Sequence, residues 1–221
     1  MKNLEDIAER AHQSFEARSQ ARDKALLQAR QLTRHAANAI RAAHRSEQAE
    51  VGSQLQIASE IVASLTRDLS DHPDLYYAGY TQDAIKEYVE ANITVALIRN
   101  ENVPSPEELK VEYATYLNGL AEAAGELRRR CLDILRQGYS QEAERLLGCM
   151  DDIYSVLVTM DYPDAITNGL RRQTDLVRGV TERTRGDLTL SIREEQLKQT
   201  MTALIDRLDR LEGEDAPDSR L

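Results

Sequence analysis

A long run of helix-forming residues near the N-terminus places the strongest constraint on the fold. From Leu4 to His44 the chain contains neither proline nor glycine, and apolar residues such as Ile7, Phe15 and Leu26 recur along it. This pattern predicts one long helix. Because a single helix of this length cannot bury its own apolar side chains, other helices must pack against it.

The overall composition also favours helices. Aromatic residues make up only 5% of the 221 residues, whereas Ala, Leu, Arg, Glu and Gln are abundant. These abundant residues lose little conformational freedom on entering a helix. We interpret the two cysteines, Cys131 and Cys149, as small apolar side chains in a reducing compartment and not as a disulfide.

Six further helices are predicted from apolar periodicity and from the positions of proline and glycine. They cover about residues 55–69, 75–99, 106–137, 140–157, 163–185 and 188–211. Ser105, Pro106 and Glu108 form a helix-start signal, with an N-cap, a proline at the first position and a reciprocal carboxylate. Gly186 and Asp187 are interpreted as a break between the last two helices.

The predicted elements correspond to an all-α fold, a seven-helix bundle with a long N-terminal helix. We expect one domain over residues 1–211 and a disordered acidic tail over residues 212–221. The first residues carry acids where a signal peptide needs an apolar run, and no stretch approaches the roughly 20 apolar residues of a membrane span. The expected location is therefore the cytoplasm.

Charge is distributed unevenly along the chain. The formal net charge is −10, so the field of the whole molecule repels polyanions and any contact with nucleic acid must be local. Residues 17–45 are the exception, because they carry many arginines and Asp23 is their only acid. This basic helix indicates either a binding surface for an anionic partner or an ordinary solvated helix face.

Two pairs of glutamates suggest a metal site. Glu87 and Glu90 are three residues apart, and Glu122 and Glu126 are four apart, so each pair projects from one face of its helix. If the two helices lie side by side, the four carboxylates converge into the hard oxygen ligands that Mg²⁺ or Mn²⁺ prefers. The alternative is that these acids are simply solvent-exposed.

Other catalytic chemistries have no candidate residues. The four histidines, at positions 12, 35, 44 and 72, lack the spacing of a zinc site and are interpreted as structural or surface residues. No serine lies in a nucleophile-elbow motif, and neither cysteine has a catalytic context. Metal-assisted hydrolysis of a phosphodiester is the chemistry that remains.

Three segments resemble the translin/TRAX family. The run from Phe15 to Arg45 resembles its first helix, including the closing His44 and Arg45. KEYVEA (residues 86–91) resembles the TRAX segment that supplies two metal-binding glutamates, and AEAAGELRRRC (residues 121–131) resembles the segment that completes the set. The composition is closer to a prokaryotic, archaeal-type TRAX-like protein than to a eukaryotic one.

This resemblance implies a metal-dependent endoribonuclease, a hydrolase that binds single-stranded RNA within a homo-octameric shell. Duplex RNA and single-stranded DNA are further partners that it implies. Glu87, Glu90, Glu122 and Glu126 take the catalytic and Mg²⁺- or Mn²⁺-binding roles. The candidate RNA-binding residues are Arg18, Arg22, Arg30, Arg34, Arg41, Arg129 and Arg130.

One departure from the family pattern concerns Glu122, which stands where eukaryotic TRAX has an aspartate and therefore has a longer reach. Two other functions stay open. A non-catalytic, translin-like shell would bind single-stranded RNA or DNA without cleaving it, and a helical interaction module would bind no nucleic acid.

Overall fold

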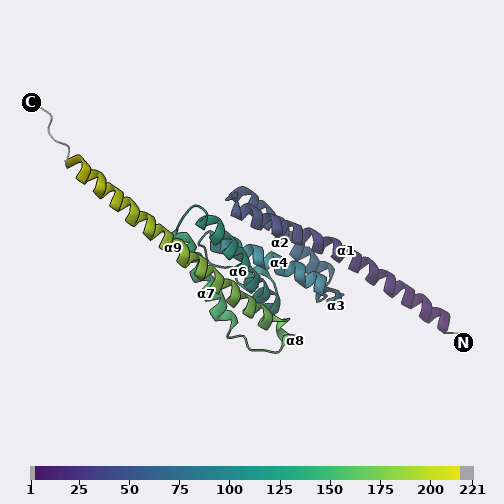
Figure 1. Ribbon diagram of the computed structural model, residues 1–221. Helices are drawn as coiled ribbons and strands as arrows, with labels where there is room; N and C mark the ends of the chain where they lie inside the picture. The colour runs from purple at the N-terminus through teal and green to yellow at the C-terminus, as the bar shows by residue number, and fades with distance from the viewer. Residues whose placement is uncertain (1–2, 215–221) are drawn as a thin grey trace, which may run out of the picture.

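The computed structural model describes residues 3–214 and contains only helices and their connections in that range (Figure 1). The helices are α1 (Leu4–His44), α2 (Gln48–Asp68), α3 (Pro73–Tyr76), α4 (Gly79–Ile98), α5 (Pro106–Leu109), α6 (Tyr113–Leu135), α7 (Gln141–Leu157), α8 (Asp164–Thr167) and α9 (Leu170–Glu214). The predictions of an all-α fold and of a long N-terminal helix are confirmed.

Four helices, α1, α4, α6 and α9, lie side by side in that order. They point in the same direction, as Figure 1 shows for α1 and α9. Between α4 and α6, Gln82 pairs with Thr115 and Lys86 pairs with Glu122, so the residue numbers increase together along both helices. Two further helices run antiparallel to these four. Helix α2 packs against α1 and α4, and helix α7 packs against α6 and α9.

The core lies where the apolar faces of these helices meet. Leu32, Leu65, Ile85, Leu127 and Met150 are all fully or almost fully buried in it. A close approach between α4 and α6 occurs at Gly119, where an added Cβ would lie 2.7 Å from Val89 Cγ1 and 2.9 Å from the Lys86 carbonyl oxygen. This contact brings the two helices that carry the predicted acidic pairs together.

Both long helices extend beyond the bundle, α1 at its N-terminal end and α9 at its C-terminal end (Figure 1). The extension of α9 carries large apolar side chains that are all at least half exposed: Leu197, Met201, Leu204, Ile205 and Leu208. Leu4, Ile7 and Phe15 are similarly exposed on α1. Apolar surface of this extent on a projecting helix indicates an interaction site.

Several predicted helix boundaries are wrong. The predicted break at Gly186 and Asp187 lies within the continuous helix α9, because Leu188 packs into the core and Asp187 pairs with Arg128 of α6. The predicted helix over residues 163–185 instead begins with the single turn α8, which ends at Asn168 in the left-handed conformation. Tertiary contacts thus decide where these helices end.

Two other predicted helices are each divided. Residues 106–137 form α5 and α6, separated by Lys110 at φ 57°, although the capping box at Ser105 and Glu108 is confirmed. Residues 75–99 form α3 and α4, and α2 begins at Gln48, well before the predicted start. The predicted count of seven is therefore wrong, since residues 3–214 form nine helices, three of them single turns.

Three other expectations concern the acidic tail, the two cysteines and membrane spans. The acidic tail predicted at residues 212–221 mostly lies outside the described residues, and α9 continues to Glu214. Cys131 and Cys149 are free thiols, as predicted. Among the helices of residues 3–214, none has the length and hydropathy needed to span a membrane.

Candidate metal centre

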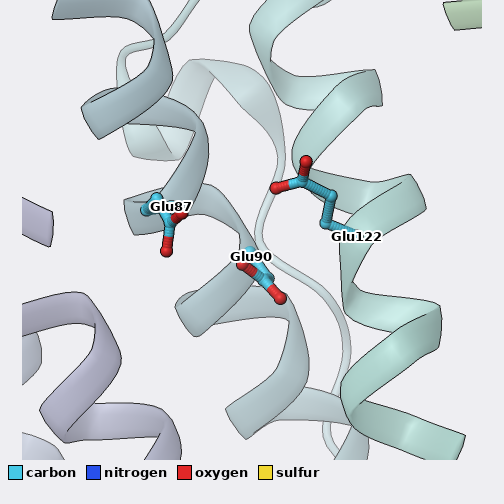
Figure 2. Close-up of side chains that lie close together, drawn as sticks. All are labelled: Glu87, Glu90 and Glu122. Carbon is cyan, nitrogen blue, oxygen red and sulfur yellow. The ribbon is translucent and has the colours of Figure 1, made fainter. Parts of the chain in front are cut away.

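The predicted acidic pairs come together between α4 and α6. Figure 2 shows Glu122 of α6 extending toward Glu87 and Glu90 of α4. Each of these three residues offers one carboxylate oxygen, and the three oxygens lie within 4.8 Å of one another. The structure therefore brings three of the four predicted glutamates into one cluster that is able to hold a cation.

A polar pocket of about 490 Å³ opens above this cluster. It is lined by residues of three helices: Ala37, Ile40 and Arg41 of α1, Glu87 and Glu90 of α4, and Glu122, Gly125, Glu126 and Arg129 of α6. Arg41 and Arg129 are both exposed and supply positive charge beside the carboxylates. The pocket thus combines carboxylates that are able to hold a hard cation with cationic side chains that are able to pair with an anion.

The carboxylates disfavour ionisation of one another. Burial, together with the charges of Glu87, Glu122 and Glu126, raises the pKa of Glu90 to about 8. Burial and the charge of Glu122 also raise the pKa of Glu87 above its ordinary value. A bound divalent cation would remove this penalty, so the donor set suits a hard divalent cation.

The fourth glutamate, Glu126, has different partners. His44 Nε2 lies 2.6 Å from Glu126 Oε2, and Arg129 Nη1 lies 3.6 Å from the same oxygen. The hydrogen bond from His44 is the main reason why the pKa of Glu126 lies below its ordinary value. Burial acts in the opposite direction but has a smaller effect. Glu126 therefore lines the pocket as an ionised carboxylate held by two basic side chains.

Lys86 and Gln173 also belong to the site. Lys86 Nζ lies 2.7 Å from Glu122 Oε1, and Gln173 of α9 donates a hydrogen bond to the same oxygen. Burial acts to lower the pKa of Lys86, but the hydrogen bond and the charge of Glu122 outweigh it and raise that pKa. The site residues predicted from the sequence did not include Lys86, Gln173 or His44. For Lys86 a signal was available, because it directly precedes Glu87 in the acidic motif.

The candidate arginines of α1 fall into two groups. Arg30, Arg34 and Arg41 are exposed and lie on one side of the helix, since their spacing returns to the same face. Arg41 lines the acidic pocket, and Arg30 lines a smaller cleft between α1 and α4 that also includes Glu87. Arg18 and Arg22, nearer the N-terminus, pair with Asp74 and Asp23.

The two candidate arginines of α6 also differ. Arg129 is 54% exposed and lines the pocket. Arg130 is only 19% exposed, pairs with Glu142 at 3.2 Å, and donates a hydrogen bond to the backbone oxygen of His44 at 3.3 Å. The contacts of Arg130 join α6 to α1 and α7, whereas Arg129 is accessible to a ligand.

The chain is similar to known proteins in sequence and in fold. No protein-family model matches the chain. An uncharacterized protein of Methanocaldococcus jannaschii, MJ0175, is 34% identical over 181 residues, which cover 80% of this chain and 79% of that protein.

Solved structures with the same fold include the crystal structure of AfC3PO, from Archaeoglobus, with a TM-score of 0.78 and 31% identity over 85% of this chain and 98% of that chain. The complex of AfC3PO with duplex RNA has a TM-score of 0.75 and 30% identity over 88% and 98% of the two chains. Apo-NeC3PO, from Nitrosomonas, has a TM-score of 0.75 and covers 86% and 98%, and at 20% identity it supports the fold alone.

Proposed function

The chain belongs to the translin/TRAX family, and we propose that it is a metal-dependent endoribonuclease that binds and cleaves single-stranded RNA inside a cytoplasmic homo-oligomeric shell. The observation that carries the proposal is the cluster of Glu87, Glu90 and Glu122, whose oxygens lie within 4.8 Å of one another in a pocket flanked by arginines. Hard oxygen donors beside phosphate-binding cations are the arrangement that metal-assisted phosphodiester hydrolysis requires.

Each group at the site has a distinct role in this proposal. Glu87, Glu90 and Glu122 hold Mg²⁺ or Mn²⁺, and Glu126 completes the set from the adjoining turn of α6. A cation bound there would lower the pKa of a bound water and stabilise negative charge that develops on the phosphate. Arg129, which lines the same pocket, binds the phosphate oxygens and orients the scissile bond.

The path of the RNA follows α1. Arg30, Arg34 and Arg41 form an exposed basic strip along one side of that helix, and Arg41 ends the strip at the acidic pocket. A local strip of this kind overcomes the repulsion expected from a net charge of −10. The duplex RNA bound by the similar protein AfC3PO supports RNA as the ligand class.

A shell of several copies is supported by the exposed apolar side chains of the projecting helices. Leu197, Met201, Leu204 and Leu208 would be covered by another subunit. An inward-facing site would also separate the basic strip from the acidic exterior. The octamer implied by the family resemblance is the assembly that we propose.

A non-catalytic nucleic-acid-binding shell is the second candidate. It is favoured by one observation, namely that Lys86 and His44 already form short contacts with Glu122 and Glu126. Basic side chains therefore offset part of the negative charge without a metal. In this alternative the acids are structural, and the arginines of α1 bind RNA or single-stranded DNA.

Cleavage of labelled single-stranded RNA distinguishes the two functions. The wild-type protein is incubated with Mg²⁺ or Mn²⁺, and with a chelator, beside Glu126→Ala and a variant in which all four glutamates are alanine. We expect metal-dependent products for the wild type, none for either variant, and unchanged RNA affinity for Glu126→Ala.

A matched control is Glu60→Ala, because Glu60 is an exposed acid on α2 outside the pocket. This variant should cleave RNA like the wild type. RNA binding without metal-dependent products in any sample would establish the non-catalytic shell, and equal activity of Glu126→Ala and wild type would remove Glu126 from the site.

A further inference from the structure

We propose that His44 is the positioning residue for Glu126, which it holds in the orientation needed to complete the cation site. His44 lies in the last turn of α1, and its Nε2 is 2.6 Å from Glu126 Oε2 on α6. This inference rests on the proposed function, because it takes Glu126 to be part of the metal site. The hydrogen bond gives the Glu126 carboxylate a fixed direction before a cation binds.

The surroundings of the imidazole leave it one polar contact. The side chain of His44 is 5% exposed, and its Nδ1 is buried without a hydrogen-bond partner in the part of the chain that the structure describes. An ionised carboxylate only accepts hydrogen bonds, so Nε2 must carry the hydrogen. The contact with Glu126 therefore fixes both the tautomer of His44 and the position of the Glu126 oxygen.

The backbone of His44 is held as firmly as its ring. Arg130 donates a hydrogen bond to the His44 carbonyl oxygen and also pairs with Glu142 of α7. This network joins the end of α1 to α6 and α7, so the imidazole cannot withdraw without breaking contacts among three helices. Such constraint is what a residue needs to orient another side chain.

The other partner of Glu126 is poorly suited to this task. Arg129 is 54% exposed and lies at 3.6 Å, a distance at which an exposed ion pair fixes little. Without His44, the Glu126 carboxylate would turn toward Arg129 and away from its half-buried position. His44 is also three residues from Arg41, so both lie in the same turn of α1. Arg41 lines the pocket, and His44 supports Glu126.

Mn²⁺ affinity, measured by electron paramagnetic resonance without RNA, tests this role. The variant His44→Phe keeps a flat ring but has no donor, and we expect about 10- to 100-fold weaker Mn²⁺ binding. His44→Gln places an amide donor near the position of Nε2 and should recover most of the affinity. Wild-type or tighter affinity in His44→Phe would overturn the proposal.

His35→Phe is the matched control. His35 also lies on α1, is partly buried, and has Nδ1 2.6 Å from Gln54 Oε1, away from the acidic pocket. It should bind Mn²⁺ like the wild type even where its thermal stability falls as far as that of His44→Phe. In cleavage assays His44→Phe should lower kcat and leave the KM for RNA nearly unchanged, because the arginines of α1 are intact.

A metal-free measurement separates this inference from the proposed function. The chain has 4 histidines, so their ¹⁵N nuclear magnetic resonance signals can be assigned by substitution. We expect His44 to carry its hydrogen on Nε2 and to show the proton signal of a hydrogen-bonded Nε2–H group, which Glu126→Ala should remove. An unchanged Nε2–H signal of His44 in Glu126→Ala would refute the positioning role. If the wild type binds no Mn²⁺, the metal-dependent function fails, while this comparison still decides whether His44 orients Glu126.

Discussion

Glu90 makes the stability of the metal-free protein depend on pH. Its pKa is about 8 in the folded chain, against an ordinary value of 4.5. Between pH 4.5 and about pH 8 the folded state keeps the Glu90 proton, whereas the unfolded state releases it. The free energy of unfolding therefore falls as the pH rises, and the stabilisation due to Glu90 is fully lost above about pH 8. Urea unfolding at several pH values should show a loss of up to about 4 kcal/mol between about pH 5 and pH 9.

The control for this prediction is Glu90→Gln, which keeps the shape of the side chain without its charge and should largely remove the pH dependence. Saturating Mg²⁺ at about pH 8 should restore stability to the wild type, because a ligand that binds only the folded state stabilises it. A pH profile that is the same in Glu90→Gln and wild type would show that Glu90 does not carry the effect.

At the residue scale, the sequence contained part of the site. Spacing placed Glu87 with Glu90 on one face, and the family resemblance joined them to the second pair. His44 could not be assigned in this way, because it is 82 residues from Glu126 and meets it only where the end of α1 lies against α6. The sequence also could not show that Arg129 is accessible and Arg130 is not, since adjacent arginines differ only in what each one packs against.

At the scale of helices, the cluster depends on the close contact at Gly119. A Cβ there would lie 2.7 Å from Val89 Cγ1 and 2.9 Å from the backbone oxygen of Lys86, and that backbone cannot move without shifting α4. Gly119→Ala should therefore destabilise the fold by about 1–3 kcal/mol. It should also reduce cleavage by up to about 100-fold, because it moves Glu122 relative to Glu87.

Gly148→Ala provides the comparison, because Gly148 lies in helix α7 and its added Cβ would meet nothing within 4 Å. Thermal unfolding of both variants, with cleavage measured at a temperature where each is folded, separates loss of structure from displacement of Glu122. Wild-type activity and stability in Gly119→Ala would show that α4 and α6 tolerate a wider spacing.

The continuity of α9 explains why some helix boundaries could not be predicted. Glycine followed by aspartate resembles a break in local sequence, but Arg128 pairs with Asp187 and the buried Leu188 anchors the next turn. Gly186 is thus helical, and an added Cβ would meet nothing within 4 Å. Gly186→Ala should stabilise the protein by about 0.5–1 kcal/mol in thermal unfolding, whereas a true break would make it neutral or destabilising.

At the scale of the whole molecule, the projecting part of α9 is the segment least explained by a single chain. Leu197, Met201, Leu204 and Leu208 recur at intervals of three and four residues, so they form one apolar stripe along the helix. The sequence predicts a helix for these residues, but its pattern does not distinguish a buried stripe from an exposed one, because both have the same periodicity. The stripe is exposed because α9 extends beyond the bundle against which its first half packs (Figure 1).

Disruption of this stripe should therefore dissociate the proposed shell. Met201→Glu combined with Leu204→Glu places two charges in the middle of the apolar surface, where burial of an unpaired carboxylate is costly. Light scattering coupled to size-exclusion chromatography should show a smaller species for this variant, while Gln199→Glu, an exposed position on the opposite face of α9, keeps the wild-type mass. The α-helical circular dichroism signal should change little, because the mutated turns make no contact with the core of their own chain.

A wild type that is already monomeric would contradict the shell. The α1 arginines would then bind RNA on an open surface, and cleavage would not depend on either α9 substitution.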